Sequence, residues 1–193
     1  MKLEQEGLIE EIPSGGYAAR AFQERDIFDA IEIRGTLEGL AARFAAERGV
    51  TPLRLSAAKD CVSALDEIVD GPMNDDAFSR YVPLNARFHA LLLDLADSEP
   101  LRREVERATR LPFASPSGFV RAQAALPESH RILVIAQEHH RGVVDAIQNR
   151  EGARAEAIMR EHARLAHRNL QLALRGASLD LVPGAALIRR AGA

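Results

Sequence analysis

Apolar side chains recur three and four positions apart through most of the sequence, from Asp26 to about Arg175. This spacing places them on one face of an α-helix, and short breaks containing Gly and Pro separate the periodic segments. Alanine, leucine, arginine and glutamate dominate the composition, and these residues favour helix over strand. The sequence therefore predicts an all-α fold, an antiparallel bundle of six to seven helices joined by short connections.

The breaks and the capping residues predict where each helix begins and ends. Gly49 is a typical stop signal, Thr51 and Pro52 form a typical start, and a Gly-Pro pair follows the second helix. Pro83 lies inside the third helix, where it predicts either a kink or a delayed start. The expected helices span residues 26–48, 51–70, 75–97, 98–110, 127–149 and 152–175, with a loop and a short helix in 111–127.

The two ends of the chain do not follow the helical pattern. Residues 1–25 contain two strand-like pieces around a Pro-Ser-Gly-Gly turn, which predicts a β-hairpin-like segment too short to bury a core. The helical domain is expected to span residues 26–176, followed by a Gly- and Ala-rich tail over residues 177–193.

Charge and cysteine content narrow the class of protein. The 25 basic and 28 acidic residues give a net charge of −3, which is typical of a soluble surface and not of a basic nucleic-acid-binding domain. Cys61 is the single cysteine, so no internal disulfide can form. Neither a signal-peptide pattern nor an apolar run of about 20 residues occurs. We therefore expect a cytoplasmic protein without membrane contact.

Three of the six histidines fall on the apolar faces of three predicted helices. His89 lies in the apolar stripe of the third helix, one turn after Asn85, so both side chains point the same way. His140 lies near the centre of the apolar face of the 127–149 helix, and His162 lies in the apolar stripe of the last helix. These four side chains are therefore predicted to point into the bundle.

The other histidines do not share this placement. His139 lies on the flank of the face that carries His140, and His130 lies near a helix start. His167 lies nearly opposite the apolar face of its helix and is expected to be solvated. None of the three is predicted to be a ligand.

Two interpretations of the inward histidines are open. A buried imidazole costs free energy unless both of its nitrogens have partners. Either His89, His140 and His162 are independent core residues that each bond a neighbour, or a divalent ion binds all three, with Asn85 as an oxygen ligand. Such a set leaves positions for water or a ligand carboxylate and suits Zn²⁺, Ni²⁺ or Mn²⁺.

The first helix also places an arginine on its inward face. Arg34 shares that face with Ile27 and Ala41, and Glu38 follows one turn later. One interpretation is a local ion pair with Glu38, half-buried at a packing or dimer surface. The other is a guanidinium directed into the bundle, where its planar fork would bind the carboxylate of a small organic acid beside the metal.

Several segments resemble one family of regulators. DIFDAIEIRGTLEGLAARFAAERG resembles the first helix of the C-terminal effector-binding domain, FCD, of GntR-type regulators of the FadR-like subfamily. NARFHALLLDLA resembles the D-x-x-x-H motif of that domain, and His140 and His162 have the 22-residue spacing of its two final histidines. Residues 3–22 resemble the end of the family's winged helix-turn-helix and its wing.

This resemblance implies a divalent metal bound by His89, His140 and His162, and an Arg34 that faces the effector. Asn85 takes the position of the family's acidic ligand, so the site is one charge unit more positive than in the family pattern. The segments LPFASPSGF and YVPLNARFH resemble vanillate-type repressors, which makes an aromatic acid the first candidate effector.

The resemblance also implies a homodimer. Residues 1–25 hold no helix that would enter the major groove, so DNA binding is expected only through winged-helix residues that are mostly missing from this sequence.

Three functions are compatible with these patterns. The leading hypothesis is a transcriptional regulator without enzymatic activity, in which a metal and a small organic carboxylate modulate DNA binding. The alternative is a metal-dependent hydrolase of small molecules, because three histidines and an open position can activate water. That chemistry needs a base, for which the sequence offers only Glu38 and Asp94, and it contains no H-E-x-x-H motif. The third is a helical dimerisation module without a ligand.

Overall fold

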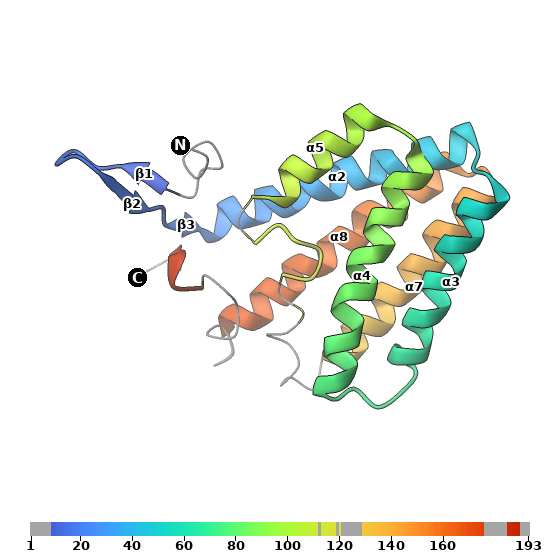
Figure 1. Cartoon of the computed structure of the whole chain (residues 1–193). Coiled ribbons are helices and arrows are strands. Elements are labelled where there is room, and N and C mark those ends of the chain that lie inside the picture. The colour runs from blue at the N-terminus through green and yellow to red at the C-terminus, as the bar shows by residue number, and fades with distance from the viewer. Residues whose placement is uncertain (1–8, 112, 119, 121–128, 176–184, 190–193) are drawn as a thin grey trace.

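The computed structural model of the chain describes residues 9–111, 113–118, 120, 129–175 and 185–189. Within these residues, six α-helices build a bundle, and four very short strands lie at one end of it (Figure 1). The predicted all-α fold and the short strands before it are thereby confirmed. The helices are α2 (Glu24–Arg48), α3 (Pro52–Val69), α4 (Asp75–Ala96), α5 (Glu99–Thr109), α7 (Ser129–Gln148) and α8 (Gly152–Arg175).

The helix ends lie within two residues of the predicted ones. Side-chain caps account for two of the starts: the Thr51 hydroxyl accepts a hydrogen bond from the first turn of α3, and the Asn74 amide oxygen does the same for α4. Pro83 lies inside α4, which already begins at Asp75, so the delayed start is wrong. The short helix expected in 111–127 falls largely on residues outside the described ones.

Helix α2 runs through the middle of the bundle and packs most extensively along α8 (Figure 1). Two glycines allow this close approach. A Cβ added at Gly35 would overlap the Cβ of Ala163, and one added at Gly39 would lie 2.8 Å from Cγ of Arg160. Because α2 also contacts α4, α5 and α7, its inward side chains reach the centre of the bundle.

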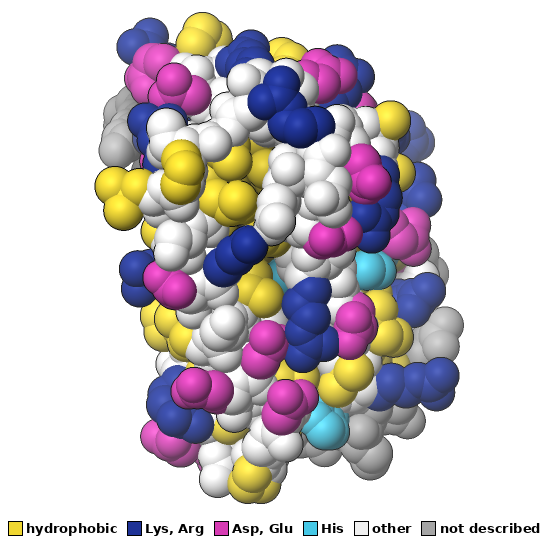
Figure 2. Space-filling model, turned by 90° about the vertical axis from the view of Figure 1, so that its right-hand side faces the viewer, with side chains coloured by type: hydrophobic (Ala, Val, Ile, Leu, Met, Phe, Trp, Pro, Cys, Tyr) yellow, Lys and Arg dark blue, Asp and Glu magenta, His cyan; other side chains and the backbone are white. Residues whose placement is uncertain are grey.

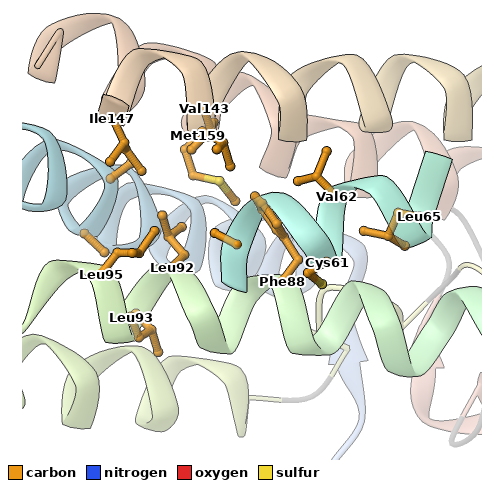
Figure 3. Packing of buried hydrophobic residues seen from close by; sticks show 14 of the residues in the cluster. Cys61, Val62, Leu65, Phe88, Leu92, Leu93, Leu95, Val143, Ile147 and Met159 are labelled. Atoms are coloured by element: carbon orange, nitrogen blue, oxygen red, sulfur yellow. The ribbon is translucent and has the colours of Figure 1, made fainter. Parts of the chain in front are cut away.

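The main core lies among α3, α4, α7 and α8. Figure 3 shows Val62 and Leu65 of α3, Leu92 of α4, Ile147 of α7 and Met159 of α8 pointing into one shared interior. Their exposed fractions are 7% or less, so the cluster holds the four helices at fixed positions. This rigid frame carries the histidines.

A second, smaller cluster closes the end of the bundle near both termini. Strand β3 (Phe22–Gln23) pairs in parallel with β4 (Ile188–Arg189), which follows the short 3₁₀ helix η2 (Ala185–Leu187). Phe22 and Ile188 pack there against Ile27, Ile31 and Leu170. The described part of the tail therefore returns to the start of α2, which its sequence did not indicate.

The predicted hairpin consists of β1 (Ile9–Glu11) and β2 (Tyr17–Ala19), which pair antiparallel. Gly15 and Gly16 in its turn have φ values of 85° and 99°, a left-handed backbone that glycine adopts without steric cost. The hairpin projects from the bundle beside the first turn of α2 (Figure 1).

Acidic and basic side chains are interspersed on the face of the molecule shown in Figure 2. This mixture agrees with the small net charge and gives that face no extended field of one sign. No helix among the described residues is long and apolar enough to cross a membrane.

Candidate metal centre

Three helices bring three buried histidines together at the centre of the bundle. His89 lies on α4, His140 on α7 and His162 on α8, with exposed fractions of 5%, 0% and 8%. One ring nitrogen from each histidine lies within 4.8 Å of the other two. The structure thus places the three histidines singled out in the sequence at one point, although they are distant along the chain.

The imidazole rings are packed as a group. The ring centroids of His140 and His162 are 4.5 Å apart, and those of His89 and His162 are 5.3 Å apart. The ring of Phe88 covers His140 at a centroid distance of 4.1 Å. These contacts restrict how far each imidazole can rotate.

Two of the rings use one nitrogen to bond a neighbouring side chain. Nδ1 of His89 lies 2.7 Å from Oε1 of Glu38, and Nδ1 of His140 lies 3.0 Å from Oε1 of Gln137. An ionised carboxylate can only accept, so His89 carries its proton on Nδ1 and donates it to Glu38. Such a bond commonly orients a histidine that binds a metal through its other nitrogen.

The ring nitrogens that bond no neighbouring side chain indicate whether the site suits a metal. Nε2 of His89, Nε2 of His140 and Nδ1 of His162 are buried and have no hydrogen-bond partner within the described part of the chain. Independent core histidines would bond a neighbour through each nitrogen, whereas here one nitrogen per ring is left over. Three imidazoles that meet at one point suit a divalent transition metal.

Burial keeps two of these imidazoles neutral. It lowers the pKa of His140 well below the usual 6.5, and the neighbouring His89 and His139 lower it further. Burial likewise lowers the pKa of His162, with further contributions from His140 and His89. A metal ligand must be deprotonated, so the neutral form is the one that binds.

Glu38 is a fully buried carboxylate with two partners. Nη1 of Arg34 donates to one of its oxygens, and His89 donates to the other. Burial raises the pKa of Glu38, but the charges of Arg34 and His89 oppose it and lower the pKa to about 2. The carboxylate is therefore ionised at neutral pH, and the Arg34 charge balances it.

Arg34 has the inward position predicted for it, with an exposed fraction of 1%. The local pair with Glu38 is formed, and it is completely buried instead of half-buried. Nε of Arg34 is also buried and has no hydrogen-bond partner among the described residues. One donor of the guanidinium thus remains available next to the histidines.

Asn85 is buried one turn before His89, as its stripe predicted. Its Nδ2 donates to Oγ of Ser117 at 3.0 Å, and the Tyr81 hydroxyl donates to its Oδ1 at 3.4 Å. Asn85 and His162 share the wall of a small cavity of about 20 Å³, large enough for about one water molecule. Its role as a metal ligand stays a prediction.

A larger cavity of about 400 Å³ lies between α4 and α5. Glu38 and His89 form part of its wall, and Arg102 and Arg110 contribute cationic side chains to the same wall. A cavity of this volume accommodates a small organic molecule.

Two expectations about neighbouring residues are wrong. His167 was expected to be solvated, but it is partly buried because the start of α2 covers that side of α8. The His167 ring packs edge-on against Phe28, with ring centroids 4.8 Å apart, and its Nε2 lies 3.2 Å from the Phe28 carbonyl oxygen. Asp94 was a candidate inward base, but its side chain is exposed and pairs with Arg102. His139 lies at the edge of the cluster, with its ring 6.0 Å from that of His162, as its flanking position predicted.

Three further residues around the site were not predicted from the sequence: Gln137, Tyr81 and Ser117. Gln137 stands three positions before His140 on the same helix face, and this spacing was a usable signal for a hydrogen-bond partner. Tyr81 precedes Asn85 by four positions on α4 in the same way. Ser117 lies outside the described helices, where no periodicity indicates which way a side chain points.

Comparisons with known proteins agree with this fold. The family model of the FCD domain matches residues 29–165, a range that contains the three histidines, Asn85 and Arg34. E. coli McbR/YncC has a similar structure, with a TM-score of 0.64, 13% identity, and coverage of 90% of this chain and 80% of that one. Streptococcus agalactiae GntR gives a TM-score of 0.55, 16% identity, and coverage of 86% and 77%.

A transcriptional regulator of the GntR family from Pseudomonas syringae pv. tomato str. DC3000 is also similar. It gives a TM-score of 0.59 and 18% identity, and the match covers 94% of this chain and 70% of that one. At these sequence identities the structural matches show similarity of fold alone. A search of curated proteins finds no match to the sequence.

Proposed function

Because the chain belongs to the FCD domain family, we propose that it is the ligand-sensing part of a GntR-type transcriptional regulator. Its helical domain binds a divalent metal through His89, His140 and His162, with Asn85 as an oxygen ligand. A small organic carboxylate, aliphatic or aromatic, binds between the metal and Arg34. The observation that carries this proposal is the convergence of three buried histidines, each of which has one buried ring nitrogen without a hydrogen-bond partner among the described residues.

The charges around the cluster support an anionic effector. The three imidazoles and Asn85 are neutral ligands, and the charge of Glu38 is balanced by Arg34. A bound divalent ion would therefore bring about two uncompensated positive charges into a buried site, and such charge is costly without an anion. A carboxylate effector offsets part of it, and Nε of Arg34 offers one further donor.

The larger cavity is a candidate route by which this effector would reach the metal site. It lies between α4 and α5 and reaches Glu38 and His89 from the outside. Arg102 and Arg110 contribute cationic side chains to this wall and Glu106 contributes a carboxylate, while Arg102 also pairs with Asp94. Arg110 is therefore the candidate contact for an organic anion along this path.

Regulation would follow from the position of the β1–β2 hairpin beside the start of α2 (Figure 1). We assign residues 1–25 to the wing and linker of a winged-helix domain, residues 26–176 to the sensor domain and residues 177–193 to a tail. In a homodimer, effector binding would shift the relative positions of two such DNA-binding heads.

The alternative of a metal-dependent hydrolase has weaker support. Glu38, the remaining inward carboxylate of the two candidates, has both oxygens engaged and a pKa of about 2. A base with so low a pKa accepts a proton poorly at neutral pH. The arrangement therefore favours binding over hydrolysis.

The proposal is tested by calorimetry on the metal-loaded protein. Protein purified without chelator is analysed for metal, loaded with Zn²⁺ and titrated with a panel of aliphatic and aromatic acids. At least one acid is expected to bind with a dissociation constant in the micromolar to millimolar range, about −8 to −4 kcal/mol.

Arginine variants make this test specific. Arg34→Lys keeps the positive charge beside Glu38 but loses the planar fork, so acid binding should weaken while Zn²⁺ still binds. Arg43→Lys is the matched control, because Arg43 lies on the same helix and pairs with Glu156 away from the histidines. If no acid binds the zinc-loaded protein, or if both variants bind acids equally well, the proposal is wrong.

A further inference from the structure

Gln137 is an uncharged polar side chain that the fold buries completely, next to the histidine cluster. It lies on α7, one turn before His140, and its amide contacts both that histidine and α3. A buried amide requires partners for its donors and its acceptor, and the particular partners found here fix its orientation.

The nitrogen of the Gln137 amide faces two oxygens of α3. Nε2 donates to the Val62 carbonyl oxygen at 2.9 Å and to Oδ1 of Asp66 at 2.5 Å. Both partners are acceptors only. If the amide were rotated by half a turn, its oxygen would face these two oxygens without a hydrogen between them, so this orientation is excluded.

Asp66 is held in place from its other side. Nη2 of Arg141 lies 2.6 Å from the same Oδ1, and this arginine also pairs with Glu138. Figure 3 shows Val62 on α3 pointing into the interior that Phe88 also enters, so the backbone at Val62 belongs to the packed core. The two acceptors for the amide are therefore fixed parts of α3.

The orientation of Gln137 decides the tautomer of His140. Oε1 faces Nδ1 of His140 at 3.0 Å, and a carbonyl oxygen can only accept. Nδ1 must therefore carry the ring proton. Nε2, which is buried without a partner among the described residues, is then left with a free lone pair.

We propose that Gln137, oriented by Val62 and Asp66, is a positioning residue that holds His140 in its Nδ1–H tautomer and so presents Nε2 to the metal. The inference rests on the proposed metal site and adds a link from α3 to it. Glu38 plays the same part for His89, but as a charged acceptor from α2. The two histidines thus receive their orientation from different helices.

The first test needs no metal and no change at Gln137. Long-range proton–nitrogen NMR of the metal-free protein reports which nitrogen of each imidazole is protonated, and His140→Phe identifies the signals of His140. The Nδ1–H form of His140 is expected in the wild-type protein. A dominant Nε2–H form would overturn the proposal, whatever the metal does.

The second test uses Gln137→Met, which keeps the length of the side chain but removes both hydrogen-bonding functions. The variant should show mixed tautomers of His140 and a Zn²⁺ affinity lower by roughly 10- to 100-fold, as for other partners of metal-bound histidines. The visible absorption of bound Co²⁺ should change as well. Gln148→Met is the matched control, since this glutamine is exposed at the end of the same helix.

Asp66→Ala is a second test of the proposal in case Gln137→Met does not fold. The Asp66 side chain is 27% exposed, and its loss leaves the Val62 carbonyl oxygen as the remaining acceptor, among the described residues, for the amide nitrogen. A smaller loss of Zn²⁺ affinity and a partly mixed tautomer are expected, whereas Asp60→Ala on the same helix should behave as wild type. A folded Gln137→Met with wild-type affinity and spectrum would contradict the proposal, and an unchanged tautomer in Asp66→Ala would contradict the part given to Asp66.

Failure of the proposed metal site and failure of the role proposed for Gln137 would give different experimental results. If the wild-type protein binds no metal, the proposed function fails, while the NMR measurement on the metal-free protein still decides the role of Gln137. If metal binds normally but His140 is protonated on Nε2, the role of Gln137 alone fails.

Discussion

Oε1 of Glu38 lies 2.7 Å from Nδ1 of His89, so a carboxylate from α2 is bonded to a histidine from α4 inside the bundle. Glu38 also receives a hydrogen bond from Arg34, four positions earlier on α2. The first helix thereby contributes both the candidate effector anchor and the residue that orients one candidate metal ligand. A change at any of the three residues is expected to affect the other two.

Arg34→Met should destabilise the protein strongly. It leaves Glu38 as a buried carboxylate without its cationic partner, which typically costs on the order of 3–5 kcal/mol. The double variant Arg34→Met with Glu38→Gln removes both charges and should lose less stability than the sum of the single changes. Urea denaturation of the three variants gives the coupling energy. Additive losses would mean that the pair does not interact as its geometry implies.

Asn85→Asp should increase the affinity for Zn²⁺, by about tenfold or more, because a carboxylate adds a negative charge next to the ion. The same change should destabilise the metal-free protein, since it buries a charge without a cationic partner. Competition with a chromogenic chelator measures the affinity, and thermal melting measures the stability. Asn149→Asp, at an exposed helix end, is the control for the added charge alone. Equal affinities of the wild type and Asn85→Asp would remove Asn85 from the ligand set.

Acidification should destabilise the metal-free protein. The pKa values of His140 and His162 in the folded state lie below the usual 6.5, so the unfolded chain binds more protons once the pH falls below that value. The free energy of unfolding therefore decreases as the pH falls through about 6.5 toward the lowered pKa values. Glu38 acts in the same direction between 4.5 and about 2, because its pKa is also lowered in the folded state.

Denaturation curves at several pH values, recorded with chelator present, measure this dependence. The double variant His140→Gln with His162→Gln should show a flatter profile above about pH 5, because the two imidazoles whose pKa values burial lowers are gone. A wild-type profile as flat as that of the variant would contradict the assignment of buried neutral histidines.

Gly35→Ala should lower stability although alanine is the better helix former by about 1 kcal/mol. The added methyl group would overlap Cβ of Ala163, so α2 and α8 must move apart at a cost of roughly 1–3 kcal/mol. Zn²⁺ affinity should fall too, because α2 carries Glu38 one turn later. Thermal melting and Zn²⁺ titration measure the two effects.

Two further variants isolate the cause of this loss. Ala163→Gly should restore much of the stability when combined with Gly35→Ala. Gly142→Ala should be tolerated, because its new methyl group would meet only the flexible end of Ile158 at 3.3 Å. A similar loss in both single glycine variants would show that helix packing at Gly35 is not the reason.

The sequence alone determined the helices and the direction in which their key residues point. The spacing of apolar residues placed Asn85 and His89 inward on one helix, and His140 rather than His139 inward on another, because a helix repeats every 3.6 residues. The same rule failed for His167, since periodicity describes one helix by itself and does not say which neighbour covers its other side.

The tertiary structure decided which inward residues meet and which of their atoms remain unpaired. Three imidazoles converge because α4, α7 and α8 pack around one core, and the packing of α2 against α4 brings Glu38 to His89. Gly35 lets α2 approach α8 closely. The bond between Gln137 and α3 and the pairing of Phe22 with Ile188 join residues far apart in the chain. Such contacts depend on how the faces of different elements fit together, and the period of any single element carries no information about that.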